Sequence, residues 1–370
     1  MKIGIDARLL GEAGLGRYIE QTISNLEDID KENQYYIFLT KKNFRKYNFR
    51  NPNFKKVKAN YKWYTIKEQI LFPILLNKYN LDLVHFPHFN VPILYNKPFI
   101  TTIHDLIVLK FPTIRATKLS PLKYKTKKIF LKFILKNAIK KSKNIIAISE
   151  FTKNDIVSYF NLSKKLEDKI TVIYEGVTGL NKNVEIGDQI KNEVLKLKPY
   201  IIYVGSAYPH KNLEMLCEAF KDINDLNLVL VGKKNFFYDR LESEYKELIN
   251  KKIFLTGYLD DNVLDFYLKN ALFYIFPSLY EGFGLPPLEA MRCSVPVLSS
   301  NASCMPEILK DSVEYFNPKD KESIKNSINK LKDNKTRLEE LKTIGNIFYR
   351  RYSWLDSAKN TFEIYKKSIK

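Results

Sequence analysis

Short apolar runs and segments with helical periodicity alternate along the chain. In the first half, the apolar runs have strand length and the intervening segments repeat apolar residues at helical spacing. The runs predict strands at Lys2–Leu10, Tyr35–Leu39, Lys55–Ala59, Leu83–Phe86, Phe99–Asp105, Asn144–Ser149 and Lys169–Tyr174. Helices are predicted between most of them, at Leu15–Leu26, Thr65–Lys78, Leu119–Lys141 and Phe151–Tyr159.

The alternation restarts after Gly176–Lys198, a segment that is poor in aromatic residues and lacks the strand pattern. Further strands are predicted at Tyr200–Gly205, Leu226–Gly232, Ile253–Gly257, Ala271–Pro277, Val295–Ser299 and Val313–Phe316. Two successive β/α alternations predict an α/β protein with two doubly wound domains and parallel sheets. We expect these domains at residues 1–177 and 199–352, with a linker region at 178–198 and a terminal helix in 353–370.

Composition narrows the class of protein. The chain has 370 residues, of which 45% are hydrophobic and only 13 are glycine, which excludes collagenous and disordered chains. No run reaches the roughly 18 uncharged apolar residues of a membrane span, and the start carries Asp6 and Arg8, so we expect a cytoplasmic protein. The 3 cysteines are widely spaced, which supports neither a disulfide framework nor a zinc site.

Positive charge is concentrated in the N-terminal half. Residues 1–180 hold 32 Lys and Arg against 15 Asp and Glu, whereas residues 181–370 hold 29 against 26. Such a field attracts nucleic acid, anionic lipid or anionic small molecules, and composition alone does not choose among them.

Ligands bind doubly wound sheets at the carboxyl ends of their strands, so the loops after strands are the places to look for chemistry. The first such loop contains Gly14 and Gly16, directly before a helix, where backbone amides can approach a phosphate. The dinucleotide fingerprint is incomplete, because Ile19 stands where its third glycine is needed. A tight turn without a ligand remains the alternative.

A second loop runs from Gly205 to Leu213 and contains Lys211 and Asn212. A lysine beside a helix N-terminus adds its charge to the helix dipole, which suits a diphosphate, and Asn212 would cap the helix. This loop lacks the spacing of a Walker motif. An ordinary surface lysine next to an N-cap remains the alternative.

A third loop, after the strand Ala271–Pro277, carries the strongest signal. Glu281 and Glu289 flank Phe283, Gly284 and Leu285, and a proline follows at the expected helix start. We expect Glu289 in the first helical turn, where it could accept two vicinal hydroxyls. Two carboxylates separated by a turn of amides, with a lysine two strands away, predict a sugar-nucleotide site. Helix capping by both glutamates is the alternative.

Together with Ile103-His104-Asp105, these loops make the chain resemble the retaining glycosyltransferases of family 4 over nearly its whole length. The resemblance implies the GT-B fold, two Rossmann-like domains with parallel sheets facing a central cleft. It implies a donor site on the C-terminal domain, an acceptor site on the N-terminal domain, and a last helix that crosses back to the latter.

The resemblance also implies roles for single residues. Glu289 would bind the ribose, Glu281 the hydroxyls of the transferred sugar, and Lys211 the diphosphate; His104 matches the active-site histidine. The implied catalytic residues are His104, Glu281 and Lys211, and the implied donor-binding residues are Gly14, Gly16, Gly205, Ser206, Lys211, Phe283, Gly284, Leu285 and Glu289. Many members carry arginine where this chain has Ser206.

The function implied is metal-independent, retaining transfer of a hexose from a nucleoside diphosphate sugar, without a further cofactor. A mannose-like sugar, as in GDP-mannose, is favoured, with a glycan or lipid-linked acceptor in cell-surface polysaccharide or lipopolysaccharide synthesis. The single D-x-D match, Asp28-Ile-Asp30, is interpreted as solvated loop. Another GT-B sugar-nucleotide enzyme, such as an epimerase, and a basic nucleic-acid-binding protein are the alternatives, although we expect no nucleic acid partner.

Three further features leave hypotheses open. His85 and His88 either line the acceptor site or pack structurally, and Trp354 is expected in the core of the last helix. Residues 118–143 contain 10 lysines and no acid. This segment is expected either to lie on an anionic bilayer, at the inner face of the cytoplasmic membrane, or to cover the sheet with its apolar side.

Overall fold

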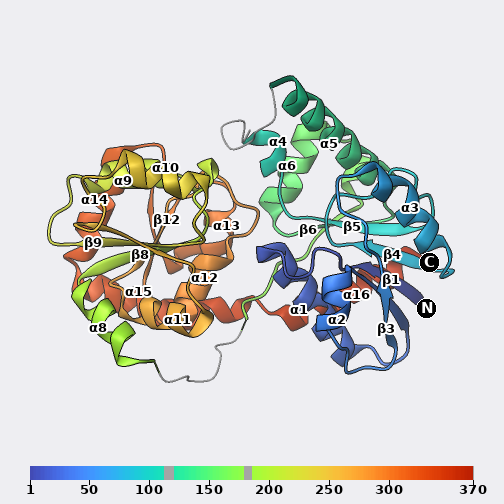
Figure 1. Ribbon diagram of the computed structural model, residues 1–370, viewed down its shortest axis with the longest axis horizontal. Helices are drawn as coiled ribbons and strands as arrows, with labels where there is room; N and C mark the ends of the chain where they lie inside the picture. The colour runs from blue at the N-terminus through green and yellow to red at the C-terminus, as the bar shows by residue number, and fades with distance from the viewer. Residues whose placement is uncertain (112–120, 179–185, 370) are drawn as a thin grey trace. The chain divides into compact units, whose positions relative to one another are not determined.

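The computed structural model describes residues 1–111, 121–178 and 186–369 (Figure 1). The chain forms two compact units. The first contains Met1–Lys110 and the described parts of Leu119–Gly176 and Tyr352–Lys370. The second contains the described part of Val177–Arg351, together with Phe111.

The first unit is built on a parallel sheet of seven strands in the order β3-β2-β1-β4-β5-β6-β7. The strands are β1 (Lys2–Asp6), β2 (Gln34–Leu39), β3 (Phe54–Lys58), β4 (Leu83–Phe86), β5 (Phe99–Ile103), β6 (Ile145–Ala147) and β7 (Ile170–Val172). Its helices are α1 (Ala13–Ile29), α2 (Lys41–Lys46), α3 (Ile66–Asn77), α4 (Ile107–Lys110), α5 (Pro121–Lys141), α6 (Glu150–Phe160), α7 (Lys164–Glu167) and α16 (Trp354–Ile369). Each predicted strand of this half is confirmed in position.

The last helix belongs to the first unit. α16 packs along α1, and the Tyr365 hydroxyl lies 2.7 Å from His85 Nδ1 on β4. Asn144 donates to the Ser368 hydroxyl at 2.8 Å. Trp354 is buried against Tyr18, which confirms its place in the core.

The second unit repeats the architecture with six parallel strands in the order β10-β9-β8-β11-β12-β13. These are β8 (Tyr200–Val204), β9 (Asn227–Val231), β10 (Ile253–Gly257), β11 (Tyr274–Phe276), β12 (Val297–Ser300) and β13 (Glu314–Phe316). The helices are α8 (Asp188–Lys196), α9 (Leu213–Phe220), α10 (Phe236–Glu244), α11 (Asp261–Asn270), α12 (Leu285–Arg292), α13 (Met305–Leu309), α14 (Lys321–Lys332) and α15 (Lys335–Phe348). Two doubly wound Rossmann-like domains with parallel sheets are thus confirmed.

Two local expectations need correction. β1 ends at Asp6 rather than Leu10, because the Asp6 carboxylate accepts the Arg8 amide and turns the chain. The segment 178–198, expected as a linker, contains α8, whose Val194 is buried and whose Glu193 accepts from the Tyr267 hydroxyl at 2.7 Å. α8 therefore packs on the second unit.

Asp28-Ile-Asp30 is not the solvated loop that we expected. Asp30 ends α1, is 3% exposed, and accepts hydrogen bonds from the Tyr35 hydroxyl and from Asn33. Although burial opposes its charge, these bonds lower the pKa of Asp30. Asp28 lies outside and pairs with Arg50. The Asp30 carboxylate therefore holds the turn from inside, whereas the Asp28 carboxylate lies on the surface.

Candidate functional site

Lys211 and Glu281 form an ion pair at the carboxyl ends of two neighbouring strands. Lys211 ends a short turn, Pro209–Lys211, that follows β8, and Glu281 lies in the loop after β11. Their Nζ and Oε1 atoms are 2.7 Å apart, and the side chains are 16% and 10% exposed. The strand order reverses between β8 and β11, so the pair occupies the switch point where doubly wound sheets bind ligands. The sequence placed this lysine two strands away, but it lies on the adjacent strand.

One backbone hydrogen bond and two from a side chain hold the two loops together. The Leu279 amide donates to the His210 carbonyl at 2.7 Å. The Asn212 side chain donates to the carbonyls of Pro277 and Pro318, at 3.1 and 2.7 Å. Asn212 occupies the N-cap position of α9 with φ 62°, but its side chain makes no capping bond. It therefore joins the loops, and the expectation that it caps the helix by its side chain is wrong.

In each of the two loops a glycine lets a neighbouring side chain approach the backbone closely. A side chain at Gly205, where φ is 155°, would meet the Tyr203 hydroxyl at 2.6 Å, and that hydroxyl donates to the Ser206 carbonyl. Gly284 has φ 89°, and a side chain there would meet Met305 at 2.3 Å. Phe283 beside it is buried.

α12 begins at Leu285 with Gly284 as N-cap, and no side chain caps it. The amides of its first turn are thus placed to receive an anion or an oxygen ligand. Glu289 is half-buried in the second turn, not in the first as expected, because the helix starts before both prolines. Glu289 lies one turn from those amides.

His104 lies at the end of β5 in the first unit and uses both ring nitrogens. Nδ1 lies 3.2 Å from Glu175 Oε1, and Nε2 lies 3.0 Å from the Pro87 carbonyl. Both partners accept hydrogen bonds, so the two ring nitrogens can donate together only when the ring is protonated. Burial opposes this charge, but the Glu175 carboxylate outweighs it and raises the pKa of His104. Glu175 was missed by sequence reasoning, since a carboxylate 71 positions away gives no local signal.

Gly14 and Gly16 lie in the first turns of α1, also in the first unit. A side chain at Gly16 would meet the Gly11 backbone at 2.6 Å, so this position requires glycine for the close approach of the loop. Gly14 is exposed, and the space around its Cα is open. Packing against Gly11 thus explains why glycine is needed at position 16. At position 14 no neighbour restricts the side chain, and the N-terminus of α1 is accessible there.

The other histidines differ in surroundings. His85 is fully buried between Tyr365 and Thr102, so it packs structurally. His88 lines a hollow in the first unit. Burial lowers the pKa of both imidazoles to about 3, and that of His210 to about 4. These three rings are neutral at pH 7.

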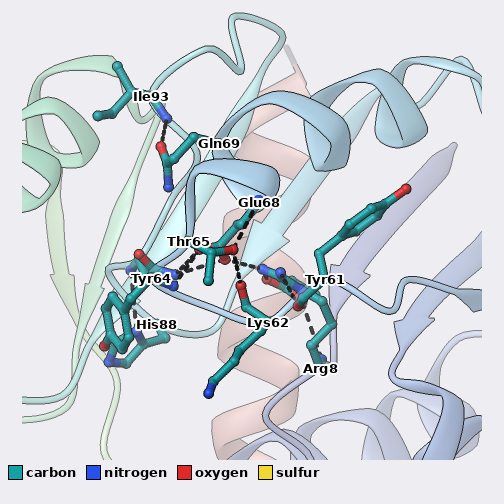
Figure 2. A network of polar contacts seen from close by, with 11 residues as sticks. Arg8, Tyr61, Lys62, Tyr64, Thr65, Glu68, Gln69, His88 and Ile93 are labelled. Carbon is teal, nitrogen blue, oxygen red and sulfur yellow. Dashed lines mark hydrogen bonds and ion pairs between the residues drawn. The ribbon is translucent and has the colours of Figure 1, made fainter.

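A second group of charges, missed by sequence reasoning, lies at the switch point of the first sheet. Arg8, after β1, pairs with Asp6 and with Glu68 of α3, each at 2.7 Å (Figure 2). Glu68 is fully buried, and the Arg8 guanidinium lies 3.9 Å from the Phe72 ring centre. Asp6 and Arg8 stand directly after the first strand, and that position was the available signal.

The described residues contain neither a cluster of metal ligands nor a helix that could span a membrane. Among residues 1–111, 121–178 and 186–369, no group of three or more His, Cys, Asp or Glu side chains is placed to hold a metal ion. In the same ranges, no helix is long and apolar enough to cross a membrane.

Comparison with known proteins agrees with this geometry. Residues 14–178 match the model of Glycosyltransferase Family 4, and residues 187–347 match that of Glycosyl transferases group 1. The chain is 27% identical to O-antigen chain mannosyltransferase RfbU of Salmonella typhimurium over 73% of this chain and 70% of that protein. It is 26% identical to O-antigen chain mannosyltransferase B of Escherichia coli, over 79% and 76%. Sucrose-phosphate synthase from Thermosynechococcus elongatus shares the fold, with a TM-score of 0.76, 19% identity and coverage of 99% and 98%.

Proposed function

Because the chain belongs to the glycosyltransferases of family 4 and group 1, with the GT-B fold, we propose that it transfers a hexose from a nucleoside diphosphate sugar to a glycan or lipid-linked acceptor. The observation that carries the proposal is the Lys211–Glu281 pair, 2.7 Å apart at the switch point of the second sheet. It lies in a loop system that also supplies the uncapped N-terminus of α12.

The donor would bind on the second unit. Glu281 holds Lys211 in place until a diphosphate competes for the ammonium group, and the carboxylate then turns to the hydroxyls of the sugar. Glu289 accepts two ribose hydroxyls. Gly205, Ser206, Phe283, Gly284 and Leu285 contribute backbone groups or shape. Gly14 and Gly16 of the first unit would let backbone amides at the N-terminus of α1 donate hydrogen bonds to the phosphates.

Lys211 and helix N-termini would stabilise the charge of the leaving diphosphate, so no metal is required. His104 of the first unit would supply a positive charge to the transferred sugar when its ring is protonated. The bond from C1 of the sugar to the diphosphate breaks with its electrons on the phosphate oxygen. That oxygen takes the proton of the acceptor hydroxyl as the new bond forms on the same face, which retains the configuration.

GDP-mannose is the favoured donor. Its support is that both O-antigen relatives are named mannosyltransferases. A panel of GDP-, UDP- and dTDP-sugars tests this by thermal stabilisation, since a ligand at 100 times its dissociation constant adds about 2.7 kcal/mol. Transfer assayed with EDTA and NMR of the product anomer test metal independence and retention. No stabilisation by any sugar nucleotide would contradict the proposal.

We further propose that α5 brings the first unit to an anionic membrane surface. Leu131, Ile134 and Leu135 of α5 are buried against the sheet, as its covering role requires. Ile129, Phe130 and Phe133 are 63%, 42% and 56% exposed beside lysines at positions 125, 127, 132 and 136, all exposed. Exposed aromatic residues among lysines suit an interface of anionic lipid and water.

Sedimentation with phosphatidylglycerol vesicles tests this contact. Charge reversal of Lys125, Lys127 and Lys136 should abolish binding at low salt, whereas reversal of Lys196, Lys198 and Lys246 in the second unit should not. Both triple variants change net charge equally, so the comparison isolates position. Wild-type protein that stays in the supernatant at low salt would contradict membrane contact.

A further inference from the structure

His104 has a third neighbour besides its two hydrogen-bond partners, Glu175 and Pro87. The ring of Tyr18, in the second turn of α1, lies 4.7 Å from the His104 ring between centroids, with 87° between the planes. This edge-to-face contact is a favoured arrangement of aromatic rings. The hydrogen bonds fix the directions of the two ring nitrogens. Tyr18 in addition limits the space into which the imidazole can turn.

The hydroxyl group of Tyr18 begins a chain of buried polar contacts. It lies 3.0 Å from the Thr102 hydroxyl on β5, which in turn lies 2.8 Å from His85 Nε2 on β4. His85 Nδ1 lies 2.7 Å from the Tyr365 hydroxyl of α16. Thr102 stands two positions before His104 on the same segment, so both side chains belong to one face of the strand. Tyr18 thus spans this face, with its hydroxyl on one residue and its ring on the other.

Every member of this chain has a partner. Burial lowers the pKa of His85 to about 3, so its ring is neutral, with one nitrogen that donates and one that accepts. The hydroxyl groups of Tyr18, Thr102 and Tyr365 can each do either. A buried polar network in which all members are paired favours a single arrangement of its side chains. The Tyr18 ring is therefore fixed before any ligand binds.

The start of the last helix supports Tyr18 from another side. α16 lies along α1 (Figure 1), and the Trp354 ring is 6.1 Å from the Tyr18 ring between centroids. A side chain at Gly176 would meet the backbone nitrogen of Trp354, so the segment that carries Glu175 also packs against this point. The two segments that hold His104, one by a charge and one through Tyr18, are thus joined to each other.

We propose that Tyr18 is a positioning residue for the transfer reaction, whose ring holds the His104 imidazole in the orientation that meets the transferred sugar. The inference rests on the proposed function, in which His104 acts on that sugar. Tyr18 is fully buried, so it acts through His104 and does not touch substrate. Its ring should therefore affect the rate of reaction. The affinity for nucleotide should change little, since the residues proposed to hold the nucleotide lie mainly on the second unit.

Histidine ring NMR of the full chain tests the contact without substrate. In Tyr18→Leu we expect the ring proton signals of His104 to move, because the ring current of Tyr18 is lost, and its N–H protons to exchange faster with water. Tyr18→Phe keeps the ring and should retain the unmodified pattern. His210 of the second unit is the internal reference. If Tyr18→Leu fails to fold, Tyr18→Met replaces it, since the flexible methionine fills irregular gaps. Unchanged His104 signals in the variant without the ring would overturn the proposal.

Turnover tests the role in the reaction. The rate of GDP release from GDP-mannose and the affinity for GDP are measured on the same variants. Tyr18→Leu should lower kcat about 10–100-fold, the typical cost of a misplaced reacting group, with little change in GDP affinity. Tyr18→Phe should restore most of this rate.

Tyr95→Leu is the matched control for turnover. Tyr95 is a tyrosine of the same unit that is 1% exposed and packs on Phe86 and Phe99. Its substitution should leave kcat unchanged. An unchanged kcat in Tyr18→Leu, or an equal fall in Tyr95→Leu, would overturn the proposal. Failure of the proposed function would instead appear as no turnover of any sugar nucleotide by the unmodified chain, and the NMR comparison would still show whether Tyr18 holds His104.

Discussion

Both units place a cation against a carboxylate at the switch point of a parallel sheet, but the two arrangements differ in how many partners each charge has. Lys211 in the second unit has one carboxylate partner, Glu281, and both side chains reach solvent. Arg8 in the first unit has two, and Glu68 also accepts from Asn90 and the Tyr64 amide. A pair with one partner can exchange it for a ligand, whereas a network with several partners can only hold its neighbours in place.

The largest difference is expected in stability. Arg8→Met should lower the free energy of unfolding by about 3–5 kcal/mol, because it leaves the buried carboxyl group of Glu68 without its cation. Lys211→Met should cost less, because the Glu281 side chain keeps 10% exposure to water whereas that of Glu68 has none. Urea unfolding of the two variants measures this contrast. Equal losses would show that the two sites do not differ as the geometry indicates.

In catalysis we expect the larger loss from substitution of Lys211 and the smaller loss from substitution of Arg8. Lys211→Ala should lower kcat about 10²–10³-fold, the typical cost of removing one preorganised donor to developing charge. Glu281→Gln should also lower kcat, but nucleoside diphosphate binding should persist or tighten, because Lys211 is released from its partner. Calorimetric titration with the nucleoside diphosphate separates the two variants. Weaker binding in Glu281→Gln would argue against a lysine that changes partners.

A smaller effect is expected at the ribose. Glu289→Ala should weaken nucleoside diphosphate binding by about 1.5–3 kcal/mol, the value of a hydrogen bond to a charged group. Glu247→Ala is the control, since that side chain is 90% exposed and lies in the same unit. The Arg8 network of the first unit should be unaffected in both variants. A donor affinity equal to that of the control would remove Glu289 from the site.

The fold could be predicted because each strand is an apolar run bounded by turn residues, and the two alternations give two sheets. Strand ends were less accurate, as at Asp6, where a side chain bond to the backbone ends β1. The register of α12 was also missed, because the two prolines both suit a first turn and the sequence does not say which helical position each takes.

Site residues with a loop motif, such as Lys211 and Glu281, could be found from the sequence, but their contact could not. That contact depends on β8 and β11 being neighbours, a property of strand order. Glu175 and Glu68 were missed for a related reason. Each is a single acid far along the chain from its partner, His104 or Arg8, and only packing brings the two together.

The smallest expected effect concerns protonation at His104. The Glu175 carboxylate raises the pKa of His104, whereas burial lowers the pKa of His85 and His88 to about 3 and of His210 to about 4. Of the 4 histidines in the chain, His104 should be the one whose ring NMR signals shift at pH values above the ordinary imidazole value of about 6.5. Titration of a second histidine in this range would contradict these environments.

Glu175→Gln sharpens that test, because it keeps a hydrogen-bond acceptor but removes the charge. The pKa of His104 should fall, because the Glu175 carboxylate is what raises it against burial. A raised pKa in the folded state gives stability that is complete below the unfolded value of about 6.5 and is lost as pH rises through the folded value. The variant should therefore be less stable than the unmodified protein at pH 6, and the difference should shrink at pH 9. A constant difference across this range would mean that Glu175 acts by packing and not by holding the imidazolium.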